Sequence, residues 1–175
     1  MCSSDLHSAA DAERAFAGAR QAGFENVSID LIFSVPGVGQ DAWRGSVDRA
    51  ISLEPEHVSA YALTIEEGTT FADRQRDGRL KPLGEDEDAA QYEWTRHRLI
   101  EAGFEQYEVS NFARSGRRSR HNWSYWTGVE YLGIGLSAHS YLGGERFWNT
   151  REIETYIDRL ERSEEHTSEL QSPCN

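Results

Sequence analysis

The sequence predicts an α/β fold that contains a parallel sheet. Two observations support this prediction. Residues 7 to 65 follow the order helix, strand, helix, strand, and an amphipathic helix separates the two β-rich segments. Parallel strands need such a crossover, whereas antiparallel strands can be joined by a tight turn. After Gly68 the regular alternation ends, which predicts a smaller α+β region toward the C-terminus.

The first two helices and the first two strands have clear boundary signals. Ser8 can cap a helix together with Asp11, and Gly23 can end it. Pro36 and Gly37 end the first β-rich segment. We therefore expect helices at 7–22 and 41–53 and strands at 26–36 and 57–65. Their apolar faces are expected to contain Ala12, Ala15, Phe16 and Ala19 in the first helix and Trp43, Val47, Ala50 and Ile51 in the second.

The second half is predicted from weaker signals. A short helix is expected at 71–76 and a linker at 78–84. The acidic residues 85–88 favour the start of a long helix, because carboxylates stabilise the positive end of the helix dipole. We expect this helix at 85–102 with Ala89, Tyr92, Leu99 and Ile100 facing inward, a strand at 104–112, a basic loop at 114–120, a further strand or hairpin at 138–148 around Gly143 and Gly144, and a closing helix at 151–160.

Asp30 is the first candidate site residue. Period two places Val27, Ile29, Leu31 and Phe33 on one face of the first strand and Ser28, Asp30, Ile32 and Ser34 on the other. The apolar face should meet the helices, so Asp30 would point to the opposite side, the interior if the sheet closes into a barrel. A carboxylate there is costly unless it is paired or binds a ligand. Either serine and backbone donors hold it, or it binds a ligand.

Other polar residues follow strand ends or lie beside buried rings. Glu66 and Glu67 follow the second strand, although a solvated turn explains them as well. A functional role is indicated less strongly for Glu108 and Asn111, which lie near the end of a predicted strand. The loop at 114–120 is either a solvated basic loop or an anion clamp built from Arg114, Arg117, Arg118 and Arg120.

The stretch from His121 to Ser140 combines histidines, aromatic residues and glycines. Rings that can stack beside a glycine-rich backbone suit a large flat ligand, and a packed turn and strand would also explain them. His121 and His139 could bind a metal or heme, although single histidines are commonly structural. Nothing in their spacing forms a helical metal-ligand pair.

Both ends resemble translated sequencing-adapter DNA. The segment from Arg162 to Ser172 matches one adapter strand, and MCSSDL matches its reverse complement. We therefore expect adapter-derived ends at 1–6 and 162–175, which contain both cysteines, and a genuine segment at about 7–161 cut from a longer gene. That segment offers no cysteine for zinc or disulfides. The net charge of −12 argues against nucleic-acid binding, and no apolar run could span a bilayer.

Taken together, several blocks resemble one family. The blocks NVSIDLIFSVPG, PEHVSAYALTIEEGT, GFEQYEVSNFAR, HNWSYW and YLGIGLSAHS are similar, in this order, to the oxygen-independent coproporphyrinogen III oxidase family of the radical S-adenosylmethionine (SAM) superfamily. HNWSYW is similar to the HNxxYW motif of its heme-chaperone branch.

The resemblance implies a partial (β/α)6-type barrel at 7–80, followed by an incomplete family-specific α+β domain at 81–161. It implies a [4Fe-4S] cluster and SAM, but the cluster-binding CxxxCxxC should lie upstream, so this segment alone should be inactive. Asp30 matches the strand aspartate that contacts SAM, and Thr64 and His139 fall near further SAM contacts. His121, Asn122, Tyr125 and Trp126 match the heme-associated motif.

We therefore expect a cytoplasmic heme chaperone whose partners are heme or a porphyrin and heme-acceptor proteins, without nucleic acid. An oxidase that decarboxylates coproporphyrinogen III is the alternative. A non-enzymatic α/β interaction domain is the third interpretation.

Overall fold

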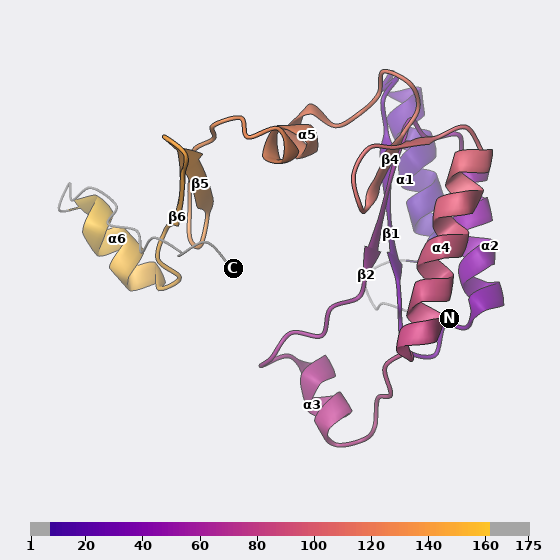
Figure 1. Cartoon of the computed structure of the whole chain (residues 1–175), viewed down its shortest axis with the longest axis horizontal. Coiled ribbons are helices and arrows are strands. Elements are labelled where there is room, and N and C mark those ends of the chain that lie inside the picture. The colour runs from indigo at the N-terminus through magenta and orange to yellow at the C-terminus, as the bar shows by residue number, and fades with distance from the viewer. Residues whose placement is uncertain (1–7, 162–175) are drawn as a thin grey trace. The chain divides into compact units, whose positions relative to one another are not determined.

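The structure is a computed structural model that describes residues 8–161. The two expected adapter-derived ends lie outside the described residues. The chain divides into two compact units, Met1–Ser119 and Arg120–Asn175. The first contains α1 (Ala9–Gln21), β1 (Ser28–Phe33), α2 (Gln40–Ser52), β2 (His57–Ala62), α3 (Thr70–Arg76), α4 (Glu85–Glu101), β3 (Glu105–Gln106) and β4 (Asn111–Ala113) (Figure 1). The second contains α5 (Arg120–Trp126), β5 (His139–Leu142), β6 (Glu145–Trp148) and α6 (Ile153–Glu161).

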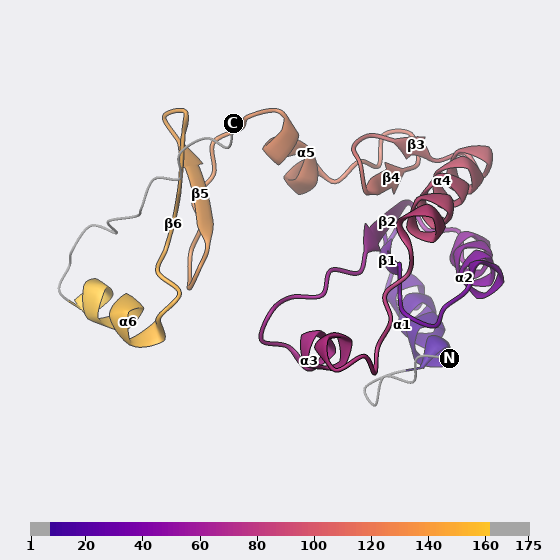
Figure 2. The ribbon, with the colours of Figure 1, turned by 60° about the horizontal axis from the view of Figure 1, so that its bottom comes forward.

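The first unit is built on a four-stranded sheet with the order β1-β2-β4-β3. β1 and β2 pair in parallel through the α2 crossover, which confirms the predicted β-α-β unit. β4 then pairs antiparallel with β2, and β3 pairs antiparallel with β4. In both views α2 and α4 lie on the same side of β1 and β2 (Figure 1, Figure 2). The sheet is therefore mixed, with one face covered by helices.

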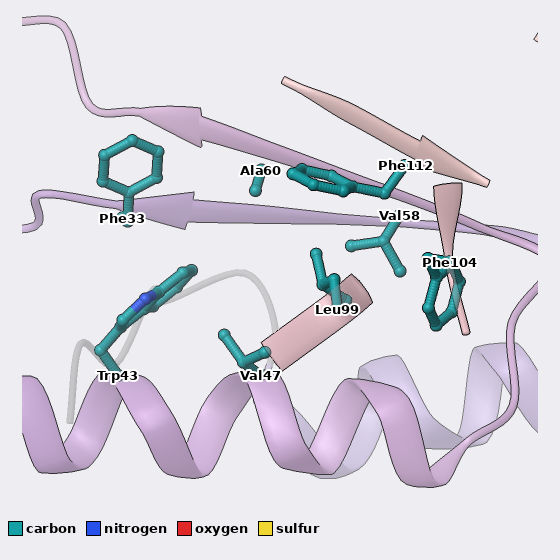
Figure 3. Packing of buried hydrophobic residues seen from close by; sticks show 8 residues of the cluster. All are labelled: Phe33, Trp43, Val47, Val58, Ala60, Leu99, Phe104 and Phe112. Atoms are coloured by element: carbon teal, nitrogen blue, oxygen red, sulfur yellow. The ribbon is translucent and has the colours of Figure 1, made fainter. Parts of the chain in front are cut away.

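The core lies between this covered face and the two helices. Phe33, Val58 and Phe112 of the sheet pack in one cluster with Trp43 and Val47 of α2 (Figure 3). The remaining core residues in Figure 3 are Ala60, Leu99 and Phe104. Each fully buried large apolar side chain contributes about 1.5–3 kcal/mol. The predicted faces of β1 are confirmed, because Phe33 is buried while Ser28, Asp30 and Ile32 are exposed.

The prediction of a single strand at 104–112 is wrong. The chain makes two short strands, β3 and β4, that fold back on each other. The Tyr107 N–H donates to the Asn111 carbonyl at 3.2 Å. The Ser110 N–H donates to the Glu108 carboxylate at 2.9 Å within the intervening turn. These local bonds close a hairpin where the alternating pattern predicted one continuous strand.

The predicted inward face of α4 needs correction. Ala89 and Ile100 are exposed, whereas Leu99 is buried as predicted and Tyr92 is partly buried. The buried face is completed by two polar residues, Gln91 and Thr95. An apolar pattern could not find them, because hydrogen bonds within the core compensate for their burial.

The α1 helix begins with the predicted capping box, since the Ser8 hydroxyl accepts from the Asp11 N–H and the Asp11 carboxylate accepts from the Ser8 N–H. Its apolar stripe, however, is not fully buried and lines a groove of about 770 Å³ with α2 and β1. Ion pairs connect the helix to neighbouring elements instead. Arg49 binds Glu13 at 2.6 Å, and Arg20 binds Glu56 at 2.8 Å.

The second unit contains the predicted hairpin, formed by β5 and β6 around Gly143 and Gly144. The helix α5 was not predicted; it contains the whole HNWSYW block. No helix among residues 8–161 is long and apolar enough to cross a membrane. The compact units divide after Ser119, so the family-based boundary expected after residue 80 lies within the first unit, where α4 packs on α2.

Candidate functional site

The uncovered face of the sheet contains a polar row that crosses three strands. Asp30 of β1 is opposite Ser59 of β2, and Ser59 is opposite Asn111 of β4. Neighbouring partners in a sheet project to the same face, so these three side chains share one side. Ser59 and Asn111 are each only 4% exposed, whereas Asp30 is exposed. Among the described residues, none donates a hydrogen bond to the Asp30 carboxylate, which can therefore accept hydrogen bonds from a ligand.

His57 is the buried centre of a second row on this face. Its Nδ1 is 2.8 Å from the Ser28 hydroxyl, and its Nε2 is 2.7 Å from the Tyr107 hydroxyl. Burial lowers the pKa of His57, while the Asp30 and Glu108 carboxylates oppose that shift. The imidazole is thus held between two hydroxyl groups in a setting that favours its neutral form.

The predicted SAM residues lie in both units. Asp30 is within β1, and Thr64 is an exposed residue just beyond the end of β2. Since β1 and β2 are parallel, their carboxyl ends lie side by side at the same end of the sheet. Ser34, the first residue after β1, has a φ of 62° and donates its N–H to the Gln91 side chain at 2.9 Å. His139 lies in the second unit, with its ring 5.8 Å from that of Trp148.

The predicted heme residues lie on one helix of the second unit. The Tyr125 hydroxyl is 3.0 Å from His121 Nε2, and the two rings meet edge to face at 4.9 Å. Both side chains are exposed. Trp126 is 60% exposed, whereas Asn122 is partly buried. The helix therefore offers an accessible imidazole, phenol and indole within two turns.

The aromatic contacts continue beyond this helix. The Tyr125 ring meets Tyr131 edge to face with a centroid distance of 4.7 Å. Tyr131 in turn exchanges two backbone hydrogen bonds of 2.9 Å with Tyr141 of β5. A flat aromatic ligand could add to such a series of rings, because edge and face contacts stabilise aromatic pairs.

The glycines of YLGIG support the local backbone. A Cβ on Gly133 would lie 2.1 Å from the His139 carbonyl oxygen. The Gly133 N–H donates to the Ser140 hydroxyl at 2.9 Å, and Asn149 donates to the carbonyls of Gly133 and Gly135. These contacts favour the packed turn and strand as the interpretation of these glycines.

Two arginines of the basic loop are engaged within the first unit. Arg114 lies 4.1 Å over the Phe104 ring and donates to the Ala102 carbonyl. Arg118 pairs with Glu105 at 3.1 Å. These contacts favour the structural interpretation of the two residues over an anion clamp. Glu66 and Glu67 are exposed beyond β2, as expected for a solvated turn.

The sequence patterns did not predict that the face of the sheet with Asp30 also contains His57, Ser59 and Tyr61. The signal was present, since polar and small apolar residues alternate in HVSAYA. Aligning that alternation with β1 in a parallel register would have placed His57 beside Ser28 and Ser59 beside Asp30. Tyr61 reaches Asn111 Oδ1 at 3.4 Å.

An iron–sulfur cluster does not fit the described residues. Residues 8–161 contain no group of three or more His, Cys, Asp or Glu side chains that could hold a metal ion. Both cysteines, Cys2 and Cys174, lie outside this range.

Comparisons with known proteins agree on one relationship. The chain is 39% identical over 155 residues to the heme chaperone HemW of Bacillus subtilis and 43% identical over 155 residues to that of Mycobacterium tuberculosis. These matches cover 89% of this chain and 41% and 40% of the two relatives. The chain is also 42% identical over 133 residues to the mouse mitochondrial radical S-adenosyl methionine domain-containing protein 1, covering 76% of this chain and 30% of that relative.

A solved structure shares the fold. The radical SAM coproporphyrinogen III oxidase HemN from Escherichia coli matches with a TM-score of 0.71 at 19% identity, over 97% of this chain and 41% of that one. No family model matches the sequence. The chain thus spans about two fifths of the length of the HemW relatives.

Proposed function

Since this chain belongs to the family that includes the HemW heme chaperones, we propose that it is part of a heme chaperone that binds heme and transfers it to acceptor proteins. The observation that carries the proposal is the exposed His121–Tyr125 pair within HNWSYW. Its imidazole and phenol are both side chains that bind heme iron in proteins. Trp126 and the neighbouring tyrosines would add aromatic surface for the porphyrin.

In this proposal the first unit contributes to a SAM site. Asp30 would accept hydrogen bonds from the hydroxyl or amino groups of SAM, and Thr64 would bind beyond the carboxyl end of β2. His139, which belongs to the second unit, is proposed as a SAM contact on the family resemblance alone. The [4Fe-4S] cluster that the resemblance implies would be held in the full-length protein by ligands outside residues 8–161.

Heme titration tests the proposal. Ferric heme added to the 175-residue chain is expected to give a saturable bound absorption spectrum. Removal of a group that binds or supports the iron commonly lowers metal affinity by about 10–100-fold, and we expect this of His121→Ala. His97→Ala is the matched control, because this exposed histidine lies on α4 in the other unit. Equal heme affinity in the parent chain and in His121→Ala would refute the role of His121.

The oxidase alternative is supported by the fold shared with HemN. It predicts that the reduced full-length protein converts coproporphyrinogen III to protoporphyrinogen when SAM is present. Failure to form product under these conditions would remove the alternative. The 39–43% identity to the HemW relatives favours the chaperone.

An α/β interaction domain without a small ligand is the remaining alternative. This alternative does not require cluster-binding cysteines in the full-length protein. Determining the DNA sequence upstream of the segment that encodes residue 7 distinguishes it directly. A CxxxCxxC motif in frame would exclude this alternative, and its absence would contradict the proposed radical SAM protein.

A further inference from the structure

The geometry of the His121–Tyr125 pair indicates which atom would bind heme iron. This inference rests on the heme binding proposed above. The residues are four positions apart on α5, so their side chains lie on one face of the helix. The Tyr125 oxygen is 3.0 Å from His121 Nε2, a hydrogen-bond distance. The outer nitrogen of the imidazole is therefore already engaged.

Direct binding of iron by His121 Nε2 would break this hydrogen bond. The imidazole would have to turn away from Tyr125, and the phenol would lose its partner. Binding of iron by the Tyr125 oxygen, in contrast, leaves the two residues in contact. A phenolate oxygen can accept from a neighbouring N–H while it binds a metal through another lone pair.

We propose that Tyr125 supplies the ligand to ferric heme iron and that His121 is its positioning residue. The Tyr125 O–H bond breaks, its proton forms an N–H bond at His121 Nε2, and the phenolate oxygen binds the iron. The new imidazolium N–H then donates to the phenolate oxygen. No electron is transferred, and the existing hydrogen bond becomes a charge-assisted one. A bound cation favours loss of the ligand proton in the same way that zinc favours loss of a thiol proton.

The surroundings of Tyr125 would hold its ring in place. Tyr131 contacts it edge to face at 4.7 Å, and Tyr131 is itself fixed by two backbone hydrogen bonds to Tyr141. The ring of Tyr125 thus contacts the rings of both His121 and Tyr131, while 41% of the residue stays exposed. A ligand oxygen needs this combination of a fixed ring and solvent access.

The test compares three single variants with the parent chain after addition of ferric heme. Resonance Raman spectra report phenolate-to-iron modes, which shift when the tyrosines are ring-deuterated. Tyr125→Phe keeps the ring and removes only the oxygen, so these modes should disappear. His121→Ala should retain them while heme affinity falls about 10–100-fold, as expected for the loss of a group that supports a ligand. Tyr131→Phe keeps the ring of the neighbouring tyrosine and removes only its hydroxyl, so it tests the competing ligand and should keep the modes.

The outcomes separate this inference from the proposed function. Heme binding that persists in Tyr125→Phe with an unchanged imidazole-type spectrum would overturn the tyrosine ligand and leave heme binding intact. Phenolate modes that survive in Tyr125→Phe but vanish in Tyr131→Phe would assign the ligand to Tyr131 and also overturn the inference. Absence of saturable heme binding by the parent chain would instead refute the proposed function.

Discussion

The buried side chain of His57, on the same face of the sheet as Asp30, makes the stability of the fold depend on pH. Its imidazole is 5% exposed and lies between the Ser28 and Tyr107 hydroxyl groups. Burial lowers its pKa from the ordinary value near 6.5, although the carboxylates of Asp30 and Glu108 oppose the shift. Between the lowered and the ordinary pKa, the unfolded chain binds a proton that the folded chain does not.

The free energy of unfolding should therefore fall as the pH is lowered below about 6.5 and through the folded-state pKa of His57. Urea unfolding at a series of pH values measures this dependence. His57→Gln should reduce it within that window. Glu13 and Glu56 have lowered pKa values as well, but their stabilising effect is lost at lower pH, beneath their ordinary value of 4.5. An identical pH dependence in His57→Gln would contradict the assignment.

Gly133 gives a second prediction at the residue scale. A Cβ there would overlap the His139 carbonyl, which belongs to the backbone and cannot rotate away. Overpacking of this kind costs about 1–3 kcal/mol, so Gly133→Ala should destabilise the second unit. Hydrogen exchange in a peptide that covers β5 and β6 should become faster. Gly18→Ala serves as the control, since nothing lies within 4 Å of the added atom in α1; unchanged exchange in Gly133→Ala would show that the loop adapts.

At the scale of a single helix, buried polar side chains fix the position of α4 against its neighbours. Gln91 is 2% exposed and accepts from the Ser34 N–H while it donates to the Val38 carbonyl at 3.1 Å. Thr95 accepts from the Trp43 indole at 2.7 Å. The helix thereby connects to the loop after β1 as well as to α2.

Gln91→Leu should destabilise the chain even though it makes the core more apolar. The substitution leaves the Ser34 N–H and the Val38 carbonyl without this partner, at a cost of about 1–3 kcal/mol. Ile100→Lys should change stability by less than about 0.5 kcal/mol, because Ile100 is 43% exposed. Urea unfolding measures both effects. A stabilising Gln91→Leu would mean that apolar packing outweighs the lost hydrogen bonds.

The same helix shows what the sequence could predict. Its start at Glu85 followed from four successive acidic residues, and the β1-α2-β2 crossover followed from alternating patterns, because both signals are local. The burial of Gln91 and Thr95 depends on partners more than fifty residues away in the chain. The same holds for the site. Asp30 was found from its own strand, but the row through Ser59 and Asn111 required the register of three strands.

At the scale of the whole molecule, β1 leaves one edge of the sheet open. Among residues 8–161, β1 pairs only with β2. Ile32 on its uncovered face is 53% exposed, and Tyr61 beside it is 41% exposed. An unpaired strand edge next to exposed apolar side chains favours pairing with a second chain.

The 175-residue chain should therefore self-associate in a concentration-dependent manner. Ile32→Lys should weaken this association, because a charged side chain on an edge strand opposes edge-to-edge pairing. Phe24→Lys is the control, since this residue is also exposed but follows α1 outside the sheet. Sedimentation velocity over a range of concentrations compares the three proteins. If the parent chain stays monomeric and melts in one sharp transition, the open edge is tolerated, and the predicted self-association is wrong.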